Sequence, residues 1–160
     1  MISNSTDIII KTVARIFIPF IQLYALYVIM HGHHSPGGGF QGGVILGASL
    51  ILLLITHGHR QAMERISEKL ISNFFSIGVL IYAGIGLLCI FFLGNFLDYG
   101  KLANLLQVDI ANARSLSILG VEIGVGLTVM AVMVSIFYNI SKPAQSRKNE
   151  ENHDKSISER

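Results

Sequence analysis

Charged residues are scarce in this sequence, and their scarcity argues against an ordinary soluble fold. Asp, Glu, Lys and Arg make up 14% of the 160 residues, whereas soluble proteins average about 25%. The net charge is only +2 and tryptophan is absent, so the composition does not indicate nucleic acid as a partner. Because Cys89 is the single cysteine, neither a disulfide framework nor a cysteine-based metal site is available.

The missing charges leave runs that are long enough to cross a membrane. Residues 16–59 and 74–97 contain no Asp, Glu, Lys or Arg, and residues 115–141 contain only Glu122. A membrane-spanning helix needs about 20 predominantly apolar residues. We therefore predict an all-α, polytopic membrane protein with four transmembrane helices and a Gly-rich, irregular start of the second helix. The predicted spans are residues 12–30, 37–56, 74–94 and 116–138.

The ends of the chain are assigned from the same pattern. The first apolar run exceeds the length of a signal-peptide core and is not followed by an A-x-A-like cleavage site, which favours a permanent helix. Residues 1–141 are predicted to form one transmembrane domain. Residues 142–160 are polar, mix both charges and lack aromatics, which predicts a disordered cytoplasmic tail. Residues 95–115, between the last two spans, are expected to be partly helical.

Basic residues divide unequally between the two sides of the predicted membrane. With four spans both termini lie on one side, which carries ten Lys and Arg, against two on the other. By the positive-inside rule the ten-residue side is cytoplasmic. The two outer ones are Lys101 and Arg114. We therefore expect cytoplasmic N- and C-termini.

The most informative segment reads Pro36-Gly37-Gly38-Gly39-Phe40-Gln41-Gly42-Gly43. It matches the dinucleotide-binding fingerprint literally, but no strand precedes it, so nucleotide binding is not predicted. The apolar residues 44–56 span about 20 Å as a helix, short of a hydrocarbon core of about 30 Å. The glycines must therefore lie at membrane depth, where irregular backbone has to be buried in protein or line a wet cavity.

Two uses of this segment are open. Gly39, Gly43 and Gly47 recur every four residues, which predicts a ridge for close helix packing, most simply against other chains. Alternatively, an opened turn presents backbone dipoles to a cation or a water chain. Gly120 and Gly124 repeat the four-residue spacing in the last helix.

Glu122 is the only carboxylate inside a predicted span. An intramembrane acid is costly when it is charged, so it should face protein or water. Gly126 and Ser115 lie on a similar helical face, which can therefore admit water or a helix. Glu122 is the candidate for the ion pathway, and the alternative is a neutral Glu that hydrogen-bonds a neighbouring helix.

Five of the six histidines fall into two groups on opposite sides of the predicted membrane. His31, His33 and His34 are candidates for a proton-responsive group, because unperturbed histidine titrates near neutral pH. His57 and His59 lie near the end of the second span. With no cysteine or carboxylate beside them, no metal site is predicted.

The run from Gly32 to Gly43, at the end of a first helix, resembles the MnhB/MrpB family, a component of Mrp-type multisubunit Na+/H+ antiporters. The run from Gly120 to Leu127, GVEIGVGL, resembles the same family, with Glu122 where Asp is more usual. The glutamine at position 41 resembles the pattern of related modules in membrane-bound hydrogenases and respiratory complexes. Membership of such a complex therefore stays open as an alternative.

The resemblance implies a non-enzymatic subunit of a complex that exchanges Na+ for protons in a prokaryotic cell (inner) membrane. It implies other membrane subunits as partners, Na+ and H+ as transported ions, and no cofactor. The structural motif would comprise Pro36, Gly37, Gly38, Gly39, Phe40, Gly42 and Gly43. A membrane-arm subunit of a hydrogenase or respiratory complex is the alternative, and a stand-alone membrane scaffold is a remote one.

Overall fold

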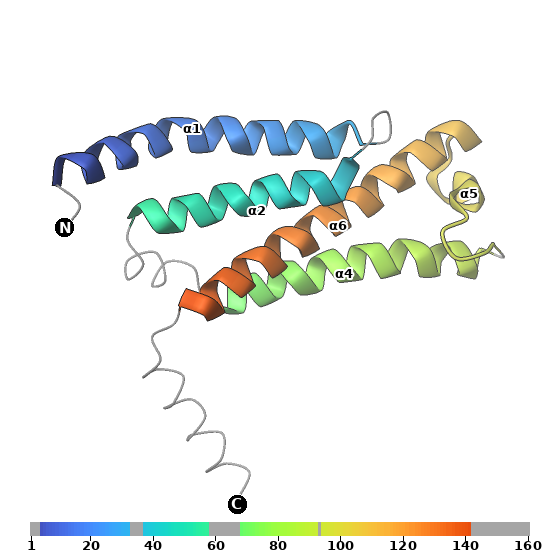
Figure 1. Cartoon of the computed structure of the whole chain (residues 1–160). Helices are drawn as coiled ribbons and strands as arrows, with labels where there is room; N and C mark the ends of the chain where they lie inside the picture. The colour runs from blue at the N-terminus through green and yellow to red at the C-terminus, as the bar shows by residue number, and fades with distance from the viewer. Residues whose placement is uncertain (1–3, 33–36, 58–67, 93, 142–160) are drawn as a thin grey trace, which may run out of the picture.

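The computed structural model describes residues 4–32, 37–57, 68–92 and 94–141 (Figure 1). Within these residues the chain forms four long helices and two short helical turns, with no strand. All four long helices are apolar and long enough to cross a membrane. The predicted all-α, four-span fold is therefore confirmed. The long helices are α1 (Asn4–Met30), α2 (Gly38–His57), α4 (Glu68–Phe91) and α6 (Ile110–Ser141).

Helix ends differ from the predicted spans because apolar runs mark the hydrocarbon core rather than the helix itself. At its start α6 extends six residues beyond the prediction, about 9 Å of additional helix. Conversely, α4 ends at Phe91, three residues early. The N–H of Gly94 donates to the carbonyl oxygen of Cys89 (3.0 Å) in the turn that follows, so Gly94 belongs to the helix terminus rather than to a span.

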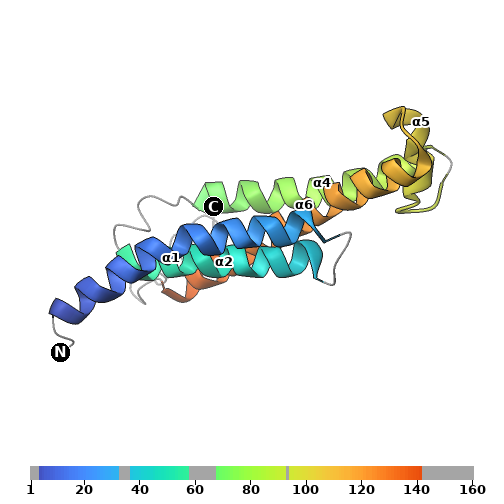
Figure 2. The same cartoon turned by 90° about the horizontal axis from the view of Figure 1, so that it is seen from above.

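The four helices pack in a row. Neighbouring helices make contact in the order α1, α2, α6, α4, so that α1 and α4 lie at the two edges (Figure 1). The starts of α1 and α4 share one end of the molecule with the ends of α2 and α6. Viewed from above, α1 and α2 overlap, and α6 crosses the view obliquely, from its end beside α2 to its start beside α4 (Figure 2). Helix α6 is thus central and contacts each of the other three long helices.

The connection from α4 to α6 folds over the opposite end of the row. It contains the turn η1 (Tyr99–Leu102) and the short helix α5 (Ala103–Leu106), in agreement with the expected partial helicity. Leu102 is buried, and the ring of Phe96 meets Tyr82 edge-on with centroids 6.2 Å apart. Burial raises the pKa of the Tyr99 phenol above its ordinary value.

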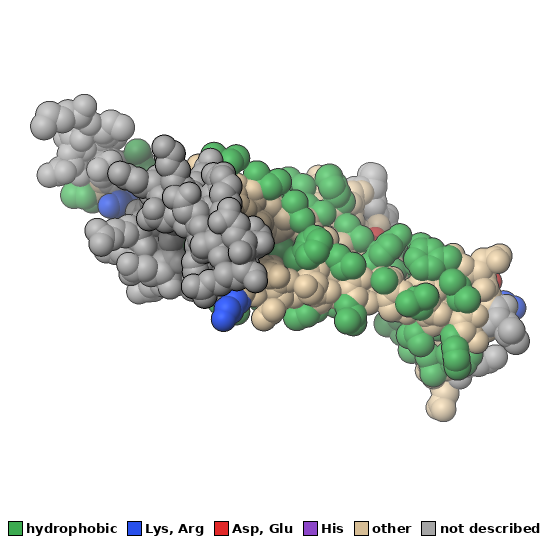
Figure 3. All heavy atoms as spheres, turned by 90° about the horizontal axis from the view of Figure 1, so that it is seen from below, with side chains coloured by type: hydrophobic (Ala, Val, Ile, Leu, Met, Phe, Trp, Pro, Cys, Tyr) green, Lys and Arg blue, Asp and Glu red, His purple; other side chains and the backbone are tan. Residues whose placement is uncertain are grey.

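A row of helices buries little of its surface. Only 17% of the most apolar stretch of α4 and 28% of that of α1 are buried. Figure 3 shows hydrophobic side chains along the length of one face, with Lys and Arg near the ends. Leu54, Ile71, Ala131 and Val134 form a small core where α2 and α4 meet α6. The broad apolar faces suit a protein surrounded by lipid and other membrane subunits.

Candidate functional site

The glycine ridge of α2 lies against α6 of the same chain. A Cβ added at Gly39 would collide with the backbone oxygen of Glu122, and one added at Gly43 would lie 2.6 Å from the backbone oxygen of Gly126. One turn further on, a Cβ at Gly47 would lie 3.2 Å from Met133 Cβ. The first two contacts are backbone-to-backbone, so only glycine fits there.

Helices α2 and α6 run parallel and their contacting residues are in register. Gly39 and Gly43 are four residues apart on α2, and their partners Glu122 and Gly126 are four apart on α6. We expected other chains to cover this ridge, whereas the structure places α6 there. The sequence could not distinguish the two cases because a glycine ridge specifies close approach and not the identity of the approaching helix.

The opposite face of α6 is packed on α4 through a second glycine contact. A Cβ at Gly78 would collide with Thr128 Oγ1 and lie 2.6 Å from the backbone oxygen of Gly124. A Cβ at Gly120 would lie 2.8 Å from the Ile85 side chain. The Thr128 hydroxyl donates to the Gly124 carbonyl oxygen (2.8 Å). Helix α6 is therefore held on both sides at the level of Glu122.

The carboxyl group of Glu122 reaches from α6 to the turn between α1 and α2. Added Cβ atoms at Gly32 and Gly38 would both contact it; the one at Gly38 would lie 2.8 Å from Oε1. Oε2 is buried, although the residue as a whole is partly exposed. Gly32 and Gly38 also lie close together, since a Cβ at Gly32 would collide with the Cα of Gly38. These two glycines, which we call the glycine hairpin, cover the acid.

Local backbone geometry explains why glycine occupies the two positions at the start of α2. Gly37 and Gly38 have φ of 134° and 50°, in the positive-φ region that residues other than glycine rarely adopt. The Gln41 side chain folds back onto Gly37. From Gly39 onward α2 is regular helix. The irregularity expected at the start of the second helix is thus confined, among described residues, to Gly37 and Gly38.

Helix ends set the electrostatics around the Glu122 carboxyl group. Gly38 and Gly39 are the first residues of α2, and a helix start carries unpaired N–H groups and a partial positive charge that stabilises a carboxylate. Helix α1 ends at Met30, and a helix end carries carbonyl oxygens with a partial negative charge. Carbonyl and carboxylate oxygens together are the ligands that a hard cation prefers. A carboxylate can accept a proton or ligate a cation, so these are the two chemistries open to Glu122.

The remaining residues of the predicted motif divide between two roles. Gly42 lies against α1, because an added Cβ would collide with the Ile29 side chain and lie 2.9 Å from the Ala25 carbonyl oxygen. Phe40 points outward and is 64% exposed, which makes it available to lipid or to another subunit. Pro36 lies outside the described residues.

Of the histidines singled out in the sequence, the structure describes only His31 and His57. His31 is exposed in the turn after α1, and its ring stacks on Tyr27 with centroids 4.1 Å apart. Its Nδ1 lies 3.1 Å from the Tyr27 carbonyl oxygen. His33, His34 and His59 lie outside the described residues, and His57 is the last residue of α2. Among described side chains, no group of three His, Cys, Asp or Glu is arranged to hold a metal ion.

Sequence reasoning treated the glycine segment and Glu122 as separate candidates and did not select Gly32 as part of a site. The structure brings all three together. One signal was present in the sequence: Glu122 and Gly126 repeat the four-residue spacing of Gly39 and Gly43. That coincidence becomes informative only when α2 and α6 are known to be neighbours.

Comparison with known proteins adds an independent line of evidence. Residues 9–135 match the profile of a family described as "Domain related to MnhB subunit of Na+/H+ antiporter". A protein of Staphylococcus haemolyticus named "Putative antiporter subunit mnhB2" is 28% identical over 138 residues, covering 86% of this chain and 96% of the relative. A Staphylococcus aureus protein of the same name is 26% identical over 141 residues, with the same coverage. The region that matches the family profile includes the glycine hairpin and Glu122.

Proposed function

We propose a function for this chain from the fact that it belongs to the family of domains related to the MnhB subunit of Na+/H+ antiporters. It is a multi-pass membrane subunit of a multisubunit Na+/H+ antiporter. Within that complex, Glu122 carries a proton or binds Na+ on the ion pathway. The observation that supports this role is the position of the Glu122 carboxyl group beneath the glycine hairpin.

Exchange follows from the chemistry of a single carboxyl group. A carboxylate oxygen can accept a proton or ligate Na+, but a protonated carboxyl group is a much poorer ligand for a cation. The two ions therefore compete for Glu122. Release of one favours binding of the other, which is the coupling that an antiporter needs. The start of α2 stabilises the negative state that exists between the two binding events.

The glycine hairpin has no side chains, and this helps the exchange at Glu122. Because Gly32 and Gly38 bring only backbone to the carboxyl group, the carboxyl group can lie directly against the turn between α1 and α2. Larger side chains would displace the carboxyl group. Close packing at Gly39 brings the α6 backbone at Glu122 directly against the start of α2.

The chain does not contain a complete pathway. No Lys lies in the apolar residues 16–59 or 115–141, where Glu122 is the only charged residue, and a proton relay across about 30 Å of bilayer needs several titratable groups. Partner membrane subunits must supply the others. Purification of the complex in mild detergent followed by mass spectrometry should recover further multi-span antiporter subunits. A stable, active homomer would contradict the proposal.

Removing the charge at Glu122 tests its role directly. Glu122→Gln keeps the shape and hydrogen bonding but can neither carry a proton nor ligate Na+ as an anion. We expect the complex to assemble while Na+-dependent proton movement in everted vesicles falls at least about tenfold. Glu122→Asp should retain part of the activity. The matched control is Asp109→Asn, which alters an exposed acid just before α6 and keeps a good helix cap. If the Glu122→Gln complex assembles and exchanges ions at the wild-type rate, Glu122 has only a structural role.

Orientation is proposed from the ten-to-two distribution of basic residues. Both termini lie in the cytoplasm, and the glycine hairpin lies near the outer surface. In a Cys89→Ala background, an impermeant thiol reagent applied from outside should label Gln107→Cys but not Gln61→Cys. The reverse labelling pattern would invert the topology.

A further inference from the structure

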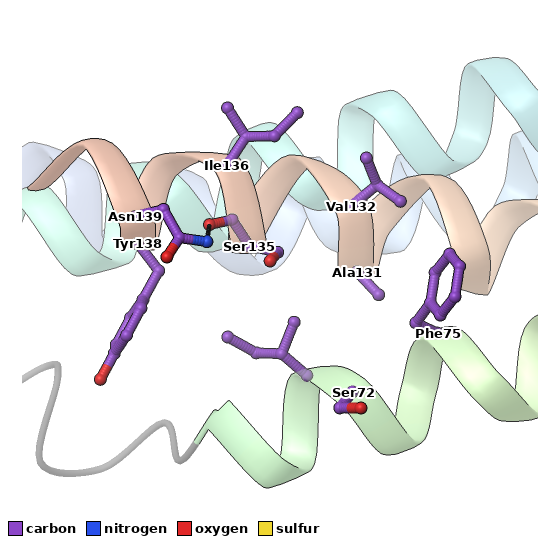
Figure 4. Close-up of a pocket in the computed structure, with 9 residues that line it drawn as sticks. Ser72, Phe75, Ala131, Val132, Ser135, Ile136, Tyr138 and Asn139 are labelled. Carbon is purple, nitrogen blue, oxygen red and sulfur yellow. Dashed lines mark hydrogen bonds between the residues drawn. The ribbon is translucent and has the colours of Figure 1, made fainter. Parts of the chain in front are cut away.

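A groove separates α4 from α6 at the end of the molecule opposite the glycine hairpin (Figure 4). Its volume is about 400 Å³, within the range of small-molecule sites. Residues near the start of α4 and the end of α6 line it. They are Ile71, Ser72, Phe75, Ala131, Val132, Ser135, Ile136, Tyr138 and Asn139.

Polarity changes along the groove. Phe75, Ala131 and Val132 line the part nearer the middle of the two helices and are apolar (Figure 4); Ala131 is buried, whereas Phe75 and Val132 are exposed. Tyr138 and Asn139 lie at the other part, close to the last residue of α6. In Figure 4 Tyr138 extends from α6 toward the start of α4. The groove is thus amphipathic, with its polar part toward the membrane surface.

The hydroxyl groups of Ser72 and Ser135 lie between these two parts. Polar side chains on a membrane span are costly when they face hydrocarbon, so such a cluster indicates water, protein or a polar ligand. The Asn139 amide donates to the Ser135 carbonyl oxygen (2.9 Å), which fixes the amide at the edge of the groove. Hydroxyl and amide donors beside an apolar trough match the ester and phosphate oxygens of a lipid joined to an acyl chain.

Charge near the groove favours an anionic ligand. Lys69 is exposed on α4, one turn before Ser72. None of the described residues that line the groove is Asp or Glu, although Glu68 precedes Lys69 in the sequence. Basic pockets between transmembrane helices on the cytoplasmic side attract anionic headgroups, and tyrosine at that depth is typical of a membrane interface.

We propose that this groove binds one anionic glycerophospholipid from the leaflet at the C-terminal end of α6. The phosphate and ester oxygens accept hydrogen bonds from the Ser72 and Ser135 hydroxyls, and the headgroup charge pairs with Lys69. One acyl chain passes along Phe75 and Val132. The proposal requires the membrane placement of the chain but not the role of Glu122, so the two can fail separately.

Filling the groove should remove the lipid. Ser72→Phe places an aromatic ring in the groove, whereas Ser76→Phe places the same ring on the same helix one turn away, at an exposed position that does not line it. Native mass spectrometry of the purified complex should show one phospholipid fewer for Ser72→Phe than for wild type and Ser76→Phe. Equal lipid counts in all three complexes would overturn the proposal.

Headgroup preference is a second measurement. Delipidated complex is incubated with phosphatidylglycerol or phosphatidylcholine, and the bound lipid is counted. The wild-type complex should retain phosphatidylglycerol several-fold better, and Lys69→Gln should reduce this preference. Equal retention of both lipids would contradict an anionic site.

A photoreactive benzophenone attached through Asn139→Cys, in a Cys89→Ala background, identifies the occupant even if Ser72→Phe fails to assemble. Cross-linking to phospholipid supports the proposal. Cross-linking to another subunit would show that a partner helix fills the groove, and the absence of any lipid adduct would equally refute it.

Discussion

The two halves of α6 make opposite kinds of contact. Near Glu122 and Gly126 its backbone touches the backbone of α2, with no side chain between them. Near Ser135 and Asn139 the same helix borders an open groove. The helix that is fixed at the proposed ion site therefore borders a groove about 20 Å away along its axis, beside the small core that contains Val134.

This difference shows how the glycines are used. Where two backbones touch, neither helix can shift or rotate without a collision, so the Glu122 carboxyl group has a defined position. Where α4 and α6 meet through side chains of different size, a groove remains between them that can take a ligand. Close packing and an open groove on one helix separate the part that requires precision from the part that accommodates lipid.

Enlarging the packed half should have the largest effect. Gly43→Leu forces a side chain against the Gly126 backbone, and overpacking of this kind costs about 3 kcal/mol or more when backbone must move. We expect assembled complex on blue-native gels to fall at least about tenfold.

Gly84→Leu is the matched control, because an added Cβ at Gly84 has no neighbouring atom within 4 Å. It should assemble as wild type does. Normal abundance of the Gly43→Leu complex would show that the α2–α6 contact is not tight in the membrane.

A cavity in the packed half should cost less stability than the overpacked contact of Gly43→Leu. Ile29 is buried and its side chain lies against Gly42 and Gly126. Ile29→Ala leaves a cavity that costs about 1–2 kcal/mol, less than in a soluble core because lipid also solvates the lost methyl groups. The midpoint of heat-induced loss of the complex should drop by a few degrees. Ile8→Ala, at an exposed position on the same helix, should leave it unchanged; an equal drop in both variants would exclude specific packing at Ile29.

Removing one hydroxyl group should have the smallest effect. Thr128 donates to the Gly124 carbonyl oxygen within its own helix, and Thr128→Val removes this bond at nearly constant volume. The expected loss is below about 1 kcal/mol, with normal antiport activity. A loss of activity as large as that of Glu122→Gln would place Thr128 on the ion pathway.

The sequence predicted the fold because each span is recorded locally. Four apolar runs, the four-residue glycine spacing and the isolated Glu122 are all visible without knowing which helices are neighbours. The assembled site is not local. Gly32 and Gly38 meet Glu122 across about 90 residues of chain, and the groove depends on side chains from α4 and α6 that carry no motif. Such contacts depend on helix order in the row, which hydropathy does not encode.

The glycine hairpin and Glu122 should act as one site, and Gly38→Ala tests this most directly. The added Cβ would lie 2.8 Å from Oε1 on a backbone with φ of 50°. The measurement is the Na+ concentration that gives half-maximal proton exchange in everted vesicles, at matched complex abundance and beside Gly84→Ala. We expect a several-fold higher concentration for Gly38→Ala and no change for the control. An unchanged value in Gly38→Ala would contradict a single site.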